Sequence, residues 1–177
     1  MKLLSWNCRG SAWSGFVLQS LFYISTFCLD LFCIVDSRVS RDQADCLVQR
    51  LGFSSSFCIP SSIGQCGGII LMWNPSMLNI SILNYHEHYI HYEIQELSTK
   101  KVWLTTFVYA YLQKAKQETM WTDLISSKPV SNIPWLLLVD FNNICSLNEK
   151  MGGSQVFTPA MIKFNKFLND CEVFVEI

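Results

Sequence analysis

The chain has 177 residues, of which 50% are hydrophobic and only 15% are charged, and its formal net charge is −1. This length suits one domain with a substantial core, and the composition excludes a disordered chain. Lysine and arginine are scattered along the sequence, so no basic run predicts tight binding to a phosphate backbone. An enzyme that meets nucleic acid mainly at a metal site is still compatible with this charge.

The first part of the chain combines short apolar runs with one long uncharged stretch. Lys2–Asn7 predicts a strand that ends in a Cys-Arg-Gly-Ser turn. The uncharged stretch Ala12–Leu29 is about as long as the shortest membrane-spanning helices. Serine, glutamine and threonine dilute it, so a buried helix is favoured over a membrane anchor. Leu31–Val35 is a continuous apolar run, typical of a strand covered on both faces.

Further elements follow in regular order. Ser40 predicts the cap of a helix over Arg41–Leu51, which Gly52 ends. Thr158 and Pro159 predict the start of a last helix. The remaining expected elements are strands at Phe53–Ile59, Ile69–Trp73, Leu78–Tyr85, His88–Gln95, Val102–Tyr109 and Trp135–Val139, and a helix at Lys114–Ser126. This mixed order predicts an α+β layered sandwich rather than a strictly parallel sheet.

Four of the expected strands end on a polar side chain. These residues are Asn7, Asp36, Tyr109 and the pair Asp140 and Asn142. If the strands lie side by side with these ends together, their tips form one polar pocket. Hard cations such as Mg²⁺ prefer carboxylate and carbonyl oxygens. The pattern therefore suggests metal-assisted hydrolysis of a phosphodiester, although a single aspartate at a strand end is more often a turn former.

Five segments carry a family resemblance: KLLSWNCRG, LFCIVDSRVS, QCGGIILMW, WLTTFVYAY and PWLLLVDFNNICSLNEKMGG. They resemble the endonuclease/exonuclease/phosphatase superfamily, and most of all the endonuclease domain of plant non-LTR retrotransposons of the LINE type. The resemblance implies a DNase I-like fold, a two-sheet β-sandwich flanked by helices in four layers (α/β/β/α). It also implies a single partial domain over residues 1–177, with Mg²⁺ or Mn²⁺ as cofactor and DNA as partner.

The resemblance also implies a role for each candidate residue. Asn7 matches the asparagine of the first motif, and Asp36 stands where the family has its metal-binding glutamate. Asn7 and Asp36 are therefore the expected metal-site residues. Tyr109 matches a tyrosine that contacts the scissile phosphate. Asp140 and Asn142 match the pair that positions the nucleophile and stabilises the transition state, so the expected catalytic residues are Asn7, Tyr109, Asp140 and Asn142.

The chain departs from the family pattern at three places. Asp36 replaces the glutamate and withdraws the carboxylate by about one methylene, which weakens a site that needs near-ideal geometry. Val139 replaces a glycine. The sequence contains no Ser-Asp-His motif, whose Asp–His pair activates the nucleophile in the family. We therefore expect a domain that is incomplete at its C-terminus and weak or inactive as an enzyme.

Cysteine and histidine suggest no competing metal site. Eight cysteines occur without a C-x-x-C pair, and reduced thiols in an intracellular protein, nuclear or cytoplasmic, are favoured over a disulfide framework. Strand alternation places His86 and His88 on one face of the strand and His91 on the other, and exposed strand positions are favoured over a metal role for all three. Two converging ligands are too few for zinc.

Three hypotheses follow from the sequence. The first is a Mg²⁺-dependent endonuclease-like phosphodiester hydrolase of retrotransposon origin. The second is a non-enzymatic remnant of the same fold. The third is a small membrane-anchored protein built on residues 12–29.

Overall fold

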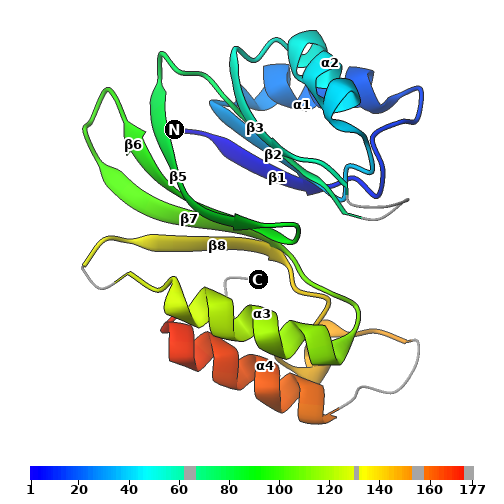
Figure 1. The fold of residues 1–177 in the computed structure, drawn as a ribbon, viewed down its shortest axis with the longest axis vertical. Helices are drawn as coiled ribbons and strands as arrows, with labels where there is room; N and C mark the ends of the chain where they lie inside the picture. The colour runs from blue at the N-terminus through cyan, green and yellow to red at the C-terminus, as the bar shows by residue number, and fades with distance from the viewer. Residues whose placement is uncertain (62–66, 130–131, 153–157, 174–177) are drawn as a thin grey trace. The chain divides into compact units, whose positions relative to one another are not determined.

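A computed structural model of the chain describes residues 1–61, 67–129, 132–152 and 158–173. They form two compact units (Figure 1). The first comprises Met1–Tyr109 and Ile133–Val139, and the second comprises Ala110–Asn132 and Asp140–Ile177. The expectation of one domain stays a prediction.

The first sheet of the first unit has a central strand that is covered on both faces. Its strands are β1 (Leu3–Asn7), β2 (Leu31–Val35), β4 (Ile69–Trp73) and β3 (Ser55–Ile59), in that order across the sheet. β1 and β2 run parallel, and the other pairs are antiparallel. Every residue of β2 is buried, which explains its continuous apolar sequence.

The second sheet is built from a hairpin and two further strands. Its order is β5 (Leu78–His86), β6 (Tyr89–Glu96), β7 (Val102–Tyr109) and β8 (Trp135–Asp140). The pairs β5–β6 and β6–β7 are antiparallel, and the register of the first shifts between Ile82 and Asn84. The last residue of β8, Asp140, is counted with the second unit.

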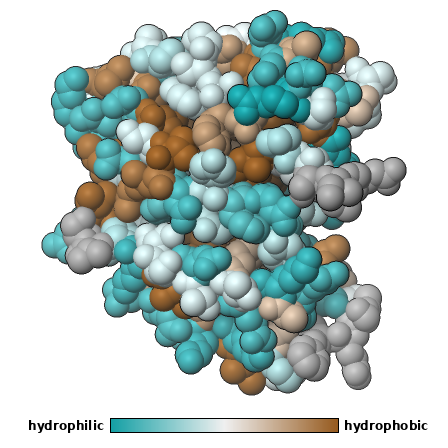
Figure 2. Space-filling view, viewed as in Figure 1, coloured by the Kyte–Doolittle hydropathy of each residue, from teal (hydrophilic) through white to brown (hydrophobic). Residues whose placement is uncertain are grey.

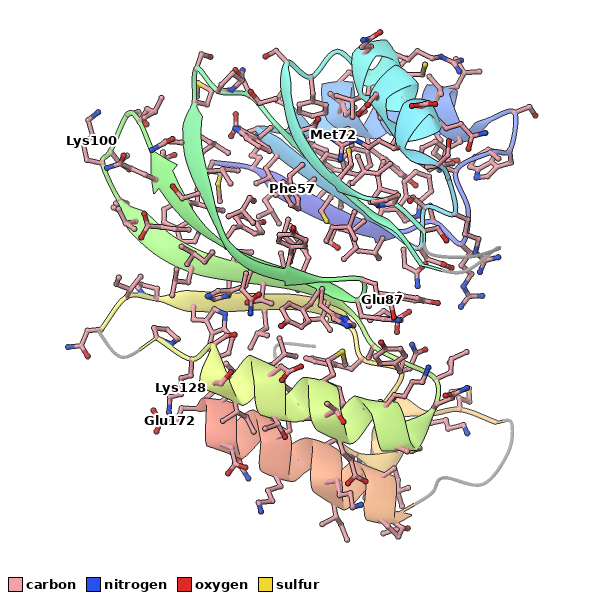
Figure 3. All side chains as sticks on the ribbon, viewed as in Figure 1. Phe57, Met72, Glu87, Lys100, Lys128 and Glu172 are labelled. Carbon is pink, nitrogen blue, oxygen red and sulfur yellow. The ribbon has the colours of Figure 1, made fainter. Side chains whose placement is uncertain are left out.

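The two sheets pack face to face around a shared apolar core. Side chains alternate along each strand, so neighbouring strands send one set inward and the other outward. In Figure 3, Phe57 points toward the second sheet, whereas Met72 points toward the helices. The fully buried core between the sheets includes Leu31, Cys33 and Leu71 of the first sheet and Ile90, Tyr92, Ile94 and Phe107 of the second.

Two helices cover the outer face of the first sheet. They are α1 (Phe16–Phe27) and α2 (Arg41–Leu51). The predicted cap of α2 is confirmed, because the Ser40 side chain accepts from the Gln43 amide and the Gln43 side chain accepts in return. The described part of the chain contains no helix long and apolar enough to cross a membrane.

The surface of the first unit exposes several large hydrophobic side chains, as the brown atoms of Figure 2 show. On α1, Leu18 is 73% exposed and Phe22 is 60% exposed. Exposed apolar side chains on β5 include Leu83 and Tyr85. The high hydrophobic content of the chain therefore serves both a core and an apolar surface.

The second unit is built on two helices and an aromatic cluster. Helices α3 (Lys114–Ser126) and α4 (Thr158–Cys171) contact each other, and the short 3-10 helix η1 (Leu147–Glu149) precedes α4. The aromatic cluster consists of Trp121 of α3, Phe164 and Phe167 of α4, and Phe141, which follows β8. These contacts hold the residues on either side of Phe141 close to the helix pair.

The predicted fold class is confirmed, because the chain forms two sheets and helices of the α+β class. Every expected helix and strand is present, with small shifts such as the start of β3 at Ser55. The expectation that the uncharged stretch forms a buried helix is wrong, because only Phe16 and Ser20 of α1 are buried. The seven cysteines that the structure describes are all free, and Cys66 lies outside the described residues.

Candidate active site

The structure brings Asn7 and Asp36 to adjacent loops of the first unit. Asn7 ends β1 opposite Val35, the last residue of β2, and Asp36 follows directly. The Cys8 amide donates to the Val35 carbonyl at 3.2 Å, and the Gly10 amide donates to the Asp36 carbonyl at 2.7 Å. Because β1 and β2 are parallel, their carboxyl ends meet at one edge of the sheet, which is the arrangement that a shared polar pocket requires of these two strands.

The Asp36 carboxylate is buried and engaged on both oxygens. Its side chain is 1% exposed. Oδ1 accepts from the Gly67 amide at 2.8 Å and from Arg38 Nε at 3.1 Å, and Oδ2 accepts from Arg38 Nη2 at 2.7 Å. No role for Arg38 was predicted from the sequence. The signal that could have found it is the spacing of an acid and an arginine two residues apart after a buried strand.

These residues do not fit the divalent cation that the resemblance implies. Carboxylate and amide oxygens are suitable ligands for Mg²⁺, but both Asp36 oxygens already accept hydrogen bonds from the protein. The Asn7 Oδ1 atom accepts from the Arg9 amide at 3.2 Å. Among the described residues, no group of three or more His, Cys, Asp or Glu side chains could hold a metal ion. The expected metal-site role of Asp36 and Asn7 stays a prediction.

Tyr109, at the end of β7, is held by His88. The Tyr109 amide donates to the His88 carbonyl at 2.8 Å, and His88 Nδ1 lies 2.7 Å from the Tyr109 carbonyl. A carbonyl can only accept, so this contact assigns the proton to Nδ1. The two rings stack with their centroids 5.8 Å apart. Glu87, labelled in Figure 3, lies 3.8 Å from His88 Nε2 through its Oε1 atom.

The expected exposed faces for the three histidines are wrong in two of the three cases. His88 lies in the turn between β5 and β6 and is only 14% exposed, because the hairpin folds it onto Tyr109. His91 is 5% exposed and forms part of a buried polar chain. Its Nδ1 atom lies 2.7 Å from Thr106 Oγ1, which accepts from Trp135 Nε1 at 2.8 Å. Only His86 has the expected exposure.

Burial lowers the pKa of His91 below its usual value, and this predicts a loss of stability in acid. The unfolded chain binds the proton more readily than the folded chain, so the contribution of neutral His91 is complete above the unfolded pKa. It is lost as the pH falls below that value. We expect the melting temperature to fall between pH 7.5 and pH 5.5, and to fall less in His91→Gln. Thermal melts of the wild type, of His91→Gln and of the exposed control His86→Gln measure this effect. An equal fall in melting temperature in all three proteins would contradict the prediction.

Asp140 and Asn142 belong to the second unit, where the loop after β8 holds itself in place. The Asn142 amide donates to Asp140 Oδ1 at 3.2 Å, and Asn142 Nδ2 donates to the Ala110 carbonyl at 2.8 Å. The Ala110 amide donates to the Asp140 carbonyl at 2.9 Å. Asn142 has a φ of 49°, a left-handed conformation that asparagine tolerates. Asp140 is therefore presented by a fixed turn.

Lys114 is a cation beside this loop that sequence reasoning missed. Its Nζ atom donates to the Asn142 carbonyl at 3.2 Å and to Asn143 Oδ1 at 2.7 Å. Partial burial lowers the pKa of Lys114. Asn143 also donates to Gln117 Oε1 at 3.1 Å, so α3 and the loop are joined by side chains. No motif marks this lysine in the sequence, because its partner is 28 residues away.

The thiol next to Asn7 is unsuited to nucleophilic catalysis. Burial raises the pKa of Cys8 to about 11. Its Sγ atom lies 3.6 Å from the carbonyl of Val35 and the same distance from that of Asp36. Since the thiolate is the reactive form, Cys8 acts as packing between the two loops.

The structure places Asn7, Asp36 and Tyr109 in the first unit, and Asp140 and Asn142 in the second. Asn7 and Asp36 lie on neighbouring loops, and Asp140 and Asn142 share one turn. That all five residues belong to one site stays a prediction.

No protein-family model and no curated protein matches the chain. Solved structures do match. The AP endonuclease LMAP from Leishmania major matches with a TM-score of 0.68 and 10% identity, over 96% of this chain and 66% of that one. The endonuclease domain of TRAS1, a telomere-specific non-LTR retrotransposon, matches with a TM-score of 0.60 and 11% identity, over 96% and 71%.

The catalytic domain of human nocturnin, solved with a bound sulfate anion, matches with a TM-score of 0.56 and 16% identity. That match covers 79% of this chain and 63% of the nocturnin chain, so this chain spans less than two thirds of that relative. A Bacteroides thetaiotaomicron protein among the neighbours is described as a member of the endonuclease/exonuclease/phosphatase family. At these identities the likeness concerns the fold, and this chain has the DNase I-like fold of the structures that it matches.

Proposed function

We propose that this chain is an endonuclease-like phosphodiester hydrolase domain that derives from a non-LTR retrotransposon. The observation that carries the proposal is that, in a DNase I-like fold, the ends of β1, β2, β7 and β8 carry Asn7, Asp36, Tyr109 and Asp140. Polar groups at the ends of these strands add nothing to the apolar core between the sheets. Their placement is consistent with binding and cleaving a phosphoester.

Each proposed role follows from the chemistry of the side chain. Tyr109 donates its hydroxyl to a phosphoryl oxygen, and Asn142 supports the developing charge through its amide. Asp140 accepts a hydrogen bond from the attacking water and so orients it. Asn7 orients a phosphate or water through its amide. DNA is the proposed partner, and the net charge of −1 makes that binding depend on the site rather than on a basic surface.

Mg²⁺ or Mn²⁺ belongs to the proposal as the cofactor that the family resemblance implies. Asp36 is paired with Arg38, so the side-chain roles above are assigned without a metal ion. The chain also contains no Ser-Asp-His motif to supply a general base, a contribution that is typically worth about 10²–10⁴-fold. We therefore expect weak turnover from residues 1–177.

The test is nicking of a supercoiled plasmid in the presence of Mg²⁺ or Mn²⁺. Asp140→Ala should reduce nicking by at least about tenfold, because it removes the group that orients the attacking water. Asp170→Ala, which changes an exposed aspartate of α4 in the same unit, should leave the rate unchanged. Nicking that is absent from the wild type, or equal in the wild type and Asp140→Ala, would refute the enzymatic proposal.

A non-enzymatic remnant of the same fold is the second candidate. The Asp36–Arg38 pair favours it, because a carboxylate that is already neutralised by a side chain is a poor start for metal-assisted hydrolysis. A wild type that melts cooperatively and nicks no plasmid under either metal would support this candidate over the first.

A further inference from the structure

The loop that follows β2 brings a cation of the protein itself to the candidate metal ligand. We infer that the Arg38 guanidinium is an internal cation that occupies Asp36 in place of a divalent metal ion, so that Mg²⁺ and Mn²⁺ do not bind through Asp36 unless Arg38 is removed. This inference concerns the site of the proposed function, but it makes a claim about metal binding that holds whether or not the chain cleaves DNA.

The contacts between the two side chains are those of a strong, directional pair. Arg38 Nη2 lies 2.7 Å from Asp36 Oδ2, and Arg38 Nε lies 3.1 Å from both carboxylate oxygens. A guanidinium presents its donors as a rigid fork that matches a carboxylate. Asp36 is 1% exposed, whereas Arg38 is 37% exposed. The buried partner is thus the carboxylate, which needs a positive charge because an unpaired buried anion is strongly disfavoured.

The backbone of this loop is shaped to make the pair. Asp36 and Arg38 both have positive φ values, 56° and 55°, which are uncommon outside glycine and turn the two side chains back toward each other. Three hydrogen bonds to a neighbouring glycine pair hold that shape. The Ser37 amide donates to the Gly68 carbonyl, the Arg38 amide donates to the Gly67 carbonyl, and the Gly67 amide donates to Asp36 Oδ1.

The Arg38 stem also lies against a third segment of the chain. A Cβ atom built on Gly10 would lie 3.4 Å from Arg38 Cδ, at ordinary van der Waals contact. Gly10 itself has a φ of 106° and donates to the Asp36 carbonyl. The pair is therefore supported by residues from three separate segments of the chain, and a metal ion would have to displace a fixed side chain.

A divalent cation competes poorly under these conditions. Mg²⁺ requires oxygens at about 2.0–2.1 Å in near-octahedral geometry and gives up its water reluctantly. The lone pairs of Asp36 already point at Arg38 and Gly67, and the positive charge of Arg38 repels a second cation at the same carboxylate. A glutamate at position 36 would carry its carboxylate one methylene further, so the shorter aspartate suits the internal pair.

Thermal melts in EDTA and in 10 mM MgCl₂ test the inference. We expect the wild-type Tm to change by less than about 1 °C on addition of Mg²⁺, since no site is free on Asp36. Arg38→Gln in EDTA should melt roughly 4–8 °C lower, because Asp36 is left buried without its cation. Mg²⁺ should then raise the Tm of Arg38→Gln by roughly 3 °C through binding to the carboxylate that has lost its arginine.

Two control variants define the source of any shift. Asp36→Asn combined with Arg38→Gln should show no Mg²⁺ response, because the carboxylate is gone. Arg41→Gln removes an exposed arginine that pairs with Asp45 at 3.5 Å and donates to the Cys58 carbonyl at 3.1 Å. Its Tm should respond to Mg²⁺ as little as that of the wild type, because Asp36 keeps its arginine. A wild-type response as large as that of Arg38→Gln, or a folded Arg38→Gln with no response, would overturn the inference.

A direct binding measurement covers the case in which Arg38→Gln does not fold. Electron paramagnetic resonance measures free Mn²⁺ in solutions of the wild type and of Asp36→Asn. The single amide oxygen of this asparagine can still accept from the Gly67 amide and from Arg38 Nε, although the acceptor for Arg38 Nη2 is lost. Equal Mn²⁺ binding by the two proteins is the expected result. A site in the wild type that Asp36→Asn loses would refute the inference. Neither readout involves hydrolysis, so failure of the plasmid assay does not decide it.

Discussion

Alanine at Gly68 is expected to lower the free energy of unfolding by about 3 kcal/mol, whereas alanine at Gly67 should lower it by only about 1 kcal/mol. Both glycines have a φ of 89°, so any side chain pays the same conformational penalty at either position. The surroundings differ. A Cβ on Gly68 would lie 2.6 Å from Ser37 Oγ and 3.2 Å from the Ser61 amide nitrogen. A Cβ on Gly67 meets no described atom within 4 Å.

Urea unfolding followed by circular dichroism measures both variants under the same conditions. The difference between them isolates the steric term, because the backbone amides of both positions are retained. Ser37 is 1% exposed and the Ser61 contact is to backbone, so neither neighbour can move aside at little energy. Equal losses in the two variants would contradict the close packing of Gly68 on Ser37.

The same substitution connects packing to the candidate site. The Gly68 carbonyl accepts from the Ser37 amide at 3.1 Å, next to the Arg38 amide that donates to Gly67. A shift of Gly68 therefore loosens the turn that sets Asp36 against Arg38. We expect the Gly68→Ala protein to lose part of the protection of the Ser37 and Arg38 amides against hydrogen exchange.

The sequence predicted those parts of the molecule that local pattern determines. Leu31–Val35 is apolar throughout because β2 is central and both of its faces are buried, so the run could be interpreted without any partner. Ser40 and Gln43 form a capping box, which depends only on residues three apart. The ends of β1 and β2 meet because parallel strands bring their carboxyl ends to one edge.

The contacts that decide the chemistry depend on distant residues, and the sequence could not place them. Asp36 meets Arg38 only because two non-glycine residues adopt positive φ values against the distant pair Gly67 and Gly68. The prediction for the histidines assumes strand alternation through His88, whereas the chain turns there and the His88 ring stacks on Tyr109. In both cases a tight turn overrides the regular period on which the prediction relied.

Replacing Trp121 with alanine is expected to lower the stability of the second unit by about 3–5 kcal/mol, the range for large aromatic side chains in a packed core. Trp121 is 6% exposed. Its ring centroid lies 4.4 Å from that of Phe167, 5.6 Å from that of Phe141 and 5.8 Å from that of Phe164. Alanine would leave a cavity bordered by three rings, which α3, α4 and the loop after β8 all help to form.

Trp13→Ala is the matched control, since it removes the same side chain from a position that is 46% exposed. We expect it to lower stability by about 1 kcal/mol, because less apolar area is removed from the protein interior. Urea unfolding distinguishes the two variants, and equal losses would show that the aromatic cluster does not form a core of its own.

Trp121→Ala should also loosen the turn that holds Asp140. Phe141 is bonded in sequence to Asp140 and packs its ring into the cluster, so the cluster anchors the turn in which the Asn142 amide donates to Asp140 Oδ1. Without Trp121 that turn loses its anchor, and hydrogen exchange at the Asn142 amide should become faster than in Trp13→Ala. Unchanged exchange at Asn142 would mean that the local hydrogen bonds alone hold Asp140, and that the aromatic cluster stabilises the helix pair without positioning the candidate site.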